Sequence, residues 1–368
     1  EFRVAADWSV TTPSWRPDVF GAVDVIEEIA RIRGLDVIPA VSVTKDASIA
    51  KSAETPRGAK SRKCRTALAA SGLQECVTYS FMKEDLAEIF GANDHQNAPR
   101  LKLLNAISVD LTQMRPSILP NLIEAASRNA DKGLYNTAFF EVGPIFYGTD
   151  LNEQPVVASG IRMGAVGARH WSGPAVSRAV DAYDAKADVL RALEACGGVI
   201  ASVQVSRDAP RWYHPGRSGT LRMGNTVIAH FGEIHPAVLN QMKITAPVVG
   251  FELFIENVPE QKRKGTAKSL LELSPFQPVS RDFAFLADAN IDADAFVKTI
   301  KAADRNVISA VEIFDIYTGK GIDTGKKSVA IAVTLQPKDH TLTEAEIDGI
   351  SQKIVALVEQ KTGAVLRS

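Results

Sequence analysis

Hydrophobic positions in the last quarter of the chain change period in a regular order. Two-residue alternation predicts strands, and a spacing of three to four residues predicts helices. From residue 274 onward this predicts strand, helix, strand, strand, helix and strand: 281–286, 294–303, 308–316, 327–335, 343–361 and 364–367. That βαββαβ order is ferredoxin-like. Thr343 and Glu346 form a capping-box pattern, which supports the start of the second helix.

The region from 57 to 270 mixes helices and strands without a repeat. Helices are predicted at 60–71, at 121–130 and from 185 to Gly197, and Gly72 suits the residue that ends the first of them. Runs rich in β-branched and aromatic residues predict strands at 76–82, 137–147, 227–234 and 248–255. We therefore expect an α+β, multidomain protein.

The segment 13–39 begins with two prolines, which favour extended chain, and continues as an amphipathic helix. Val25, Ile26, Ile29 and Ile32 fall near one face of that helix, and Asp24, Glu27 and Glu28 share the other. Asp18 can fold back toward them. Clustered carboxylates suit a hard cation such as magnesium. The alternative is structural, with Asp24 as an N-cap and Glu27 as its capping-box partner.

Length and composition indicate a globular protein of more than one domain. At 368 residues, 45% of them hydrophobic, the chain suggests two or three globular domains. It has no apolar run long enough to span a membrane and no signal segment. Three widely spaced cysteines give neither a metal pattern nor a disulfide framework, and they fit a reducing, cytoplasmic setting.

Net charge is −1, so any RNA contact must come from local patches. Two candidates are 57–65, with five basic residues, and Lys262–Lys264 with Lys268; each could equally be a solvated face. The glycine-rich turn at 318–328 is not a phosphate loop. Five residues separate Gly319 and Gly325 instead of four, and the turn joins two strands. It therefore predicts a hairpin.

Several motifs resemble the β subunit of bacterial-type phenylalanyl-tRNA synthetases. They are Pro-Ser-Trp-Arg with the following acids, Leu-Asn-x-Ile-Ser at Asn105, Arg-Pro-Ser-Ile-Leu-Pro at Arg115, Phe-Glu-Val-Gly at Glu141, His-Pro-Gly-Arg-Ser-Gly from His214, Gly-Glu-Ile-His-Pro from Gly232, and Val-Glu-Ile-Phe-Asp-Ile-Tyr in the last unit. The resemblance covers the whole chain as the C-terminal half of that subunit. One departure is His340, where the family often has arginine.

The resemblance implies four parts. Residues 1–39 would end a winged-helix-like domain, 40–56 would be a linker, 57–270 a class II synthetase-like antiparallel-sheet module without catalysis, and 274–368 a ferredoxin-fold anticodon-binding domain. Magnesium would be held by Asp18, Asp24, Glu27 and Glu28. The late strand from Gly250 lacks the arginine that ends the third class II motif, which argues against adenylation by this chain.

The implied function is support of ATP-dependent attachment of phenylalanine to its tRNA, in an assembly of two α and two β chains. The α subunit would carry the active site, and editing residues would lie upstream. The alternative is a free-standing RNA-binding or scaffold protein. For anticodon contact the candidates are Arg281, Tyr317, Lys320, Lys326 and Lys327, because aromatic rings stack on bases and cations neutralise phosphates. His214, Arg217 and His235 are expected to be structural.

Overall fold

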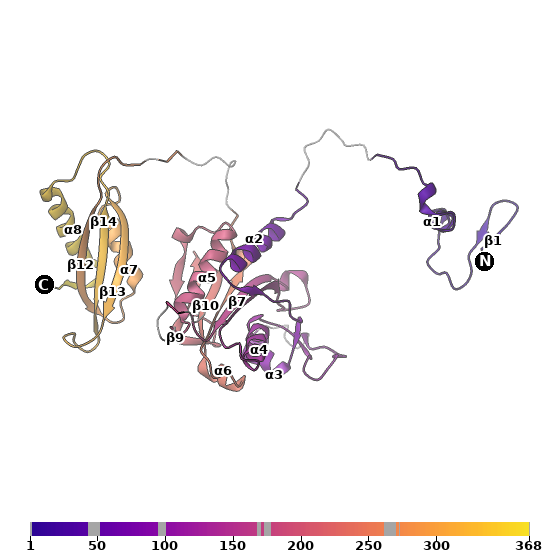
Figure 1. Ribbon diagram of the computed structural model, residues 1–368, viewed down its shortest axis with the longest axis horizontal. Coiled ribbons are helices and arrows are strands. Elements are labelled where there is room, and N and C mark those ends of the chain that lie inside the picture. Colours follow the sequence, from indigo (N-terminus) through magenta and orange to yellow (C-terminus); the bar gives the residue numbers. More distant parts are fainter. Residues whose placement is uncertain are drawn as a thin grey trace. The chain divides into compact units, whose positions relative to one another are not determined.

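The computed structural model describes residues 2–42, 52–94, 101–167, 171–172, 178–260, 270–271 and 273–367. The chain divides into two compact units, Glu1–Lys262 and Arg263–Ser368. Figure 1 shows their elements, coloured along the sequence. Among the helices in the described ranges, none is both long enough and apolar enough to cross a membrane.

The N-terminal segment holds a short hairpin and one helix. Strands β1 (Arg3–Val4) and β2 (Val10–Thr11) pair antiparallel, and α1 spans Ala22–Arg33. The structural alternative, with Asp24 as N-cap and Glu27 as its capping-box partner, is wrong. Gly21 holds that position, and an Asp24 carboxylate oxygen accepts bonds from the Phe20 and Gly21 amides, each at 2.8 Å. Because Asp24 reaches backward, the helix starts before it.

A seven-stranded sheet forms the middle module. Its order is β3 (Gln74–Glu75), β6 (Thr137–Pro144), β7 (Val156–Met163), β11 (Val248–Phe254), β10 (Thr226–Ile234), β9 (Tyr213–Met223) and β8 (Gln204–Ser206). Every neighbouring pair is antiparallel except β3 with β6. The expected antiparallel-sheet module is confirmed.

Helices cover both faces of this sheet. On one face α2 (Pro56–Ala70) and α5 (Ala182–Ala195) enclose a core with the alternate β11 residues Val249, Phe251 and Leu253. On the other face α4 (Leu119–Ala130), α3 (Glu84–Ile89) and α6 (Pro236–Gln241) pack over Val248 and its neighbours. The sheet core is therefore buried from both sides.

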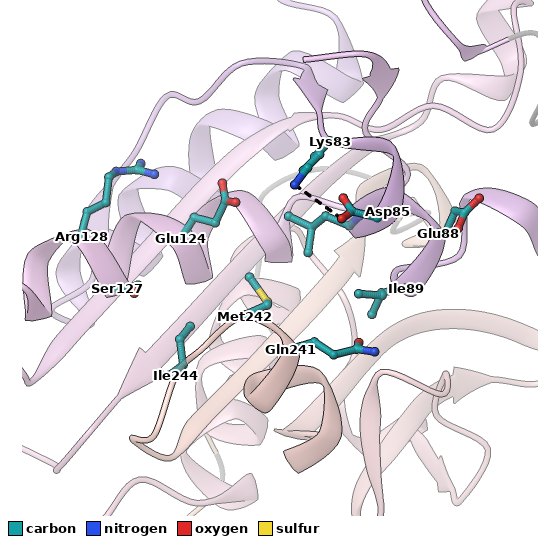
Figure 2. Close-up of a pocket in the computed structure, with 11 residues that line it drawn as sticks. Lys83, Asp85, Glu88, Ile89, Glu124, Ser127, Arg128, Gln241, Met242 and Ile244 are labelled. Carbon is teal, nitrogen blue, oxygen red and sulfur yellow. Dashed lines mark hydrogen bonds and ion pairs between the residues drawn. The ribbon is translucent and has the colours of Figure 1, made fainter. Parts of the chain in front are cut away.

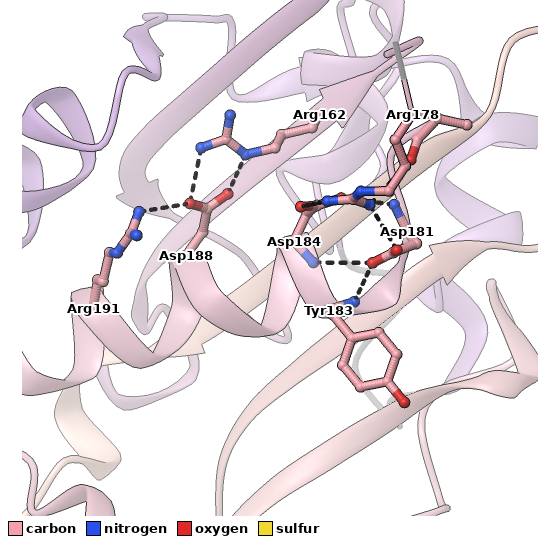
Figure 3. A network of polar contacts seen from close by, with 8 residues as sticks. Arg162, Arg178, Asp181, Tyr183, Asp184, Asp188 and Arg191 are labelled. Carbon is pink, nitrogen blue, oxygen red and sulfur yellow. Dashed lines mark hydrogen bonds and ion pairs between the residues drawn. The ribbon is translucent and has the colours of Figure 1, made fainter. Parts of the chain in front are cut away.

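Ion pairs fix α5 on the sheet (Figure 3). Arg162 of β7 binds the buried Asp188 carboxylate at 2.6 Å, and Arg191 lies 4.0 Å from the same group. At the helix start Asp181 caps the Tyr183 and Asp184 amides, and Arg178 pairs with both carboxylates. The Arg162–Asp188 pair therefore joins α5 to β7, whereas the other contacts stabilise the helix itself.

The sequence prediction failed mainly around 76–82. Instead of one strand over this stretch, the structure has β3 just before it and the two-residue strand β4 (Phe81–Met82) at its end. Strand β4 pairs with β5 (Gln113–Met114). Strands β7 and β9 were not predicted; Pro215 and two glycines in β9 argue against a strand from sequence. Helices α2 and α4 begin earlier than expected because Pro56 and Pro120 occupy their first turns.

The C-terminal unit confirms the βαββαβ prediction. It contains β12 (Val279–Asp288), α7 (Ala293–Ala303), β13 (Ile308–Tyr317), β14 (Lys326–Leu335), α8 (Glu344–Thr362) and β15 (Val365–Leu366). The antiparallel sheet has the order β13–β14–β12–β15, and both helices pack on one face around Phe285 and Phe296. Thr343 and Glu346 form the predicted capping box.

Candidate functional site

The four N-terminal acids have different partners. Asp18 and Glu28 both bind Arg16, each at 2.7 Å, and Glu28 also binds Arg31 at 2.5 Å. The Arg16 and Arg31 guanidiniums lower the pKa of Glu28 to about 2. Asp24 holds the start of α1, and Glu27 is exposed. The structure thus brings Asp18 and Glu28 together around one cationic side chain, that of Arg16.

The four N-terminal acids could offer carboxylate oxygens to a magnesium ion. Carboxylate oxygens are the ligands that this ion prefers. Within the described ranges, however, no group of three or more His, Cys, Asp or Glu side chains is arranged to hold a metal ion. The oxygens that would face a cation between Asp18 and Glu28 now face the Arg16 guanidinium. The donor chemistry fits magnesium, but the present arrangement requires Arg16 to move.

A buried ion pair links two of the sequence motifs in the middle module. Arg115 and Glu141, both almost fully buried, lie 2.8 Å apart. Arg115 also donates to the Pro144 carbonyl at 2.9 Å and to the Thr78 hydroxyl at 3.0 Å, while the Thr78 hydroxyl donates to Glu141 at 2.6 Å. A Cβ at Gly143 would lie 2.7 Å from the Arg115 guanidinium. Both motifs therefore serve one structural network.

Glu252 of β11 lies on the same face of the sheet as Glu141. Its carboxylate is buried and accepts hydrogen bonds from the Ser117 hydroxyl at 2.6 Å and from the Trp212 indole and Tyr213 hydroxyl at 3.4 Å each. Burial raises its pKa to about 7, although the three donors oppose the shift. A carboxyl, not an arginine, stands on this face of the strand.

A groove lies between α3, α4 and α6 (Figure 2). Leu86, Ile89, Met242 and Ile244 supply its apolar side chains. Its charged members include the Lys83–Asp85 pair, at 3.6 Å, and Glu124, whose pKa is raised by burial. Apolar and charged side chains thus share its lining.

Three of the five RNA-contact candidates gather at the β13–β14 hairpin. Tyr317 is 42% exposed, and its hydroxyl donates to the Lys320 carbonyl at 3.2 Å. A Cβ at Gly319 would lie 2.4 Å from that hydroxyl, so the ring rests against the glycine. Lys326 pairs with Asp323 at 3.4 Å. This hairpin end offers a positioned aromatic ring beside lysines.

The other two candidates lie on the helix-covered side of the sheet. Arg281 pairs in register with the buried Val333, whereas Tyr317 pairs with Ser328, which faces the opposite side. Lys327 donates to the carbonyls of Ala289 and Ile291, just before α7. Alternation along β14 thus separates Lys326 from Lys327. The five residues do not form one surface.

The first basic patch is largely engaged in structure. Arg57, Arg62 and Arg65 pair with Glu256, Glu54 and Glu75, and Lys60 donates to the Val258 carbonyl. The second patch, Lys262–Lys264 and Lys268, lies outside the described residues.

His214, Arg217 and His235 have structural partners, as expected. His235 accepts from the Ala237 amide at the start of α6, and His214 accepts from the Gly216 amide. Arg217 pairs with Glu233 at 2.5 Å. His340 binds Glu346 at 2.9 Å, beside the cap of α8.

Profiles of known protein families match the N-terminal segment, the middle module and the C-terminal unit. The family profile for the "Phenylalanyl tRNA synthetase beta chain CLM domain" matches residues 40–255, more than half of the chain. The chain belongs to the phenylalanyl-tRNA synthetase β-chain family. Profiles for the "tRNA synthetase B5 domain" and the "Ferredoxin-fold anticodon binding domain" match residues 2–35 and 274–367.

Curated relatives named as phenylalanine–tRNA ligase β subunits match most of the chain. The phenylalanine–tRNA ligase β subunit of Paramagnetospirillum magneticum is 50% identical over 97% of this chain, and that of Rhodospirillum rubrum is 49% identical over 98%. The chain spans 44% of the length of each. A solved pyrrolysyl tRNA synthetase, PylSc of Desulfitobacterium hafniense, is 16% identical with a TM-score of 0.40, over 54% of this chain and 66% of that one.

Sequence reasoning missed how the β-chain motifs are used. Arg115 and Glu141 stand in separate motifs with no pairing expected between them, and no role was expected of Glu252. A signal was present for the two glutamates, because Glu141 and Glu252 each stand inside an otherwise apolar run. Charged residues in such runs are rarely buried unless paired or hydrogen-bonded.

Proposed function

We propose that this chain is the C-terminal part of a phenylalanine–tRNA ligase β subunit. In that role it supports ATP-dependent attachment of phenylalanine to its tRNA, as a cytoplasmic partner of an α subunit in an α2β2 assembly. The observation that carries the proposal is the succession of B5, CLM and anticodon-binding domains in one chain, together with 50% identity over 97% of its length.

ATP and the adenylation step are assigned to the α partner. The candidate strand for a phosphate-binding arginine, β11, carries Glu252 instead, under a cover of α4, Trp212 and Tyr213. An anionic triphosphate needs multi-donor cations, and a buried carboxyl opposes it. We therefore assign the 57–270 module a scaffolding role rather than a catalytic one.

The proposed contact with the α subunit uses loops at one end of this module. Val77 and Tyr79 are 92% and 70% exposed and border the same hollow as Asp110 and Leu111. The loop that leads to Leu111 carries the exposed Leu104, Ile107 and Val109. Contiguous exposed apolar side chains mark interaction surfaces.

The test is co-expression of this chain with a bacterial phenylalanine–tRNA ligase α subunit, followed by sizing and aminoacylation. A stable complex is expected, and Ile107→Asp should weaken it, whereas Leu151→Asp, at an exposed site elsewhere on the module, should not. No complex, with tRNA still bound by the chain alone, would favour a free-standing RNA-binding protein instead.

We also propose that Asp18, Asp24, Glu27 and Glu28 hold magnesium. Because Arg16 occupies the oxygens of Asp18 and Glu28, it competes with the cation. Arg16→Ala should tighten Mn²⁺ binding, and Glu28→Gln should weaken it by roughly 10-fold or more. Electron paramagnetic resonance of free Mn²⁺ measures both. Asp7→Asn, in the same segment, is the control; equal binding by all variants would contradict the assignment.

For the anticodon we propose that Tyr317 stacks on a base, with Lys320 and Lys326 near the phosphates. Arg281 and Lys327 remain weaker candidates, because they lie on the other side of the sheet. Tyr317→Ala should weaken binding of tRNA for phenylalanine by about 1–3 kcal/mol, the usual effect of removing one stacked ring. A filter-binding titration measures this. Lys298→Ala on α7 is the control, and an unchanged affinity in Tyr317→Ala would exclude stacking.

A further inference from the structure

Two of the three cysteines meet inside the middle module. Cys64 lies on α2 and Cys196 follows the last residue of α5. Their sulfur atoms are 3.5 Å apart, and the residues are 0% and 5% exposed. Both thiols are free, and Cys76 is not part of the contact. The pair could not be recognised from the sequence, because its members are 132 positions apart.

The surroundings make the two sulfurs unequal. Cys64 packs in the apolar core beneath α5, near the Ala192 carbonyl; the hydrogen bond with Cys196, and then burial, raise the pKa of Cys64. The Cys64 thiol and then the positive charges of Lys60 and Lys63 lower the pKa of Cys196. The nearby lysines and the slightly greater exposure of Cys196 therefore favour a thiolate on Cys196, with the Cys64 thiol in contact.

We propose that Cys64 and Cys196 form a hydroperoxide-sensitive dithiol that closes to a disulfide between α2 and α5. Joining requires the sulfurs to approach from 3.5 Å to about 2.0 Å. Both cysteines belong to the same packed core, so the two sulfurs need only close this short remaining gap. In a reducing compartment such a bond is transient and redox-sensing.

The chemistry balances with one hydroperoxide. The Cys196 thiolate attacks a peroxide oxygen, the O–O bond breaks, and the leaving hydroxide takes a proton to become water. The resulting Cys196 sulfenic acid is attacked by the Cys64 sulfur. The S–O bond breaks, and the second hydroxide leaves as water with the Cys64 proton. Two thiols are oxidised, one hydrogen peroxide is reduced to two waters, and a dithiol reductant reverses the change.

The experiment treats the reduced full chain with hydrogen peroxide under native conditions, followed by alkylation, proteolysis and mass spectrometry without reductant. One cross-linked peptide pair, containing Cys64 and Cys196, is expected, and it should disappear after dithiothreitol. Cys76→Ser should give the same product in the same yield. Cys64→Ser should instead accumulate a dimedone-trappable sulfenic acid on Cys196.

A matched control is the chain oxidised in concentrated urea, where all three cysteine pairings should appear. If the native chain also gives all three, or oxygen adds to Cys76 while Cys64 and Cys196 stay reduced, the proposal is overturned. The same holds if Cys64→Ser is not trapped by dimedone, because the first step then does not occur at Cys196.

Discussion

Replacement of Arg115 by alanine should lower the free energy of unfolding of the middle module by about 3–5 kcal/mol, the cost of breaking a buried ion pair from one side. The substitution leaves the Glu141 carboxylate buried and without its guanidinium, and it removes the donors to Pro144 and Thr78. Differential scanning calorimetry of the full chain measures this. The C-terminal unit, which has its own core, provides the internal reference.

Arg217→Ala is the matched control for that experiment. This substitution also deprives a glutamate, Glu233, of its arginine partner, but the Arg217 side chain is 52% exposed. A solvated pair contributes at most about 1 kcal/mol. Similar losses in the two variants would show that burial does not set the cost. A loss in Arg115→Ala that also appears in the C-terminal transition would point to a general folding defect.

Replacement of Glu252 by glutamine should change how stability depends on pH. In the folded module the Glu252 pKa is about 7, above its ordinary value of 4.5, so folding favours the protonated form. Its favourable contribution is complete below about pH 4.5 and is lost as the pH rises to about 7. The shift corresponds to about 3 kcal/mol at most.

Wild type and Glu252→Gln should therefore differ little near pH 4.5 and diverge as the pH rises, with the variant more stable at pH 8. Urea unfolding at a series of pH values, followed through Trp212 fluorescence, measures the difference. Glu88→Gln, at an exposed carboxyl on α3, should leave the wild-type profile unchanged. A constant offset between wild type and Glu252→Gln at all pH values would mean that Glu252 does not titrate in this range.

The sequence predicted the C-terminal unit almost completely because its signals are local. Alternation along β12 and β14 and the Thr343–Glu346 box act within a few residues, and the structure places these elements within two residues of the expected bounds. The stretch 76–82 failed for the opposite reason. Its Cys76 amide binds the Phe140 carbonyl, and Glu141 binds Thr78, so contacts distant in sequence decide its course.

The candidate sites likewise divide into those set by local sequence and those set by contacts between distant segments. Tyr317, Lys320 and Lys326 could be grouped from sequence because one hairpin carries them. The alternation that separates Arg281 from Tyr317, and the two register shifts between β13 and β14, could be known only from the strand pairing. Arg115 with Glu141, and Glu252 with Tyr213, join segments that sequence periodicity cannot bring together.

The strand order of the middle sheet also has a consequence during synthesis on the ribosome. Strands β6 and β7 form a local hairpin, and β9 and β10 form another, but β7 pairs with β11, with Met163 opposite Val248. At roughly 5–20 residues per second, β7 would wait about 4–17 seconds for that partner. During this interval its apolar edge, including Val157 and Ile161, is open to other chains. Slower elongation after β7 should therefore increase aggregation of the nascent protein, and faster elongation should reduce it.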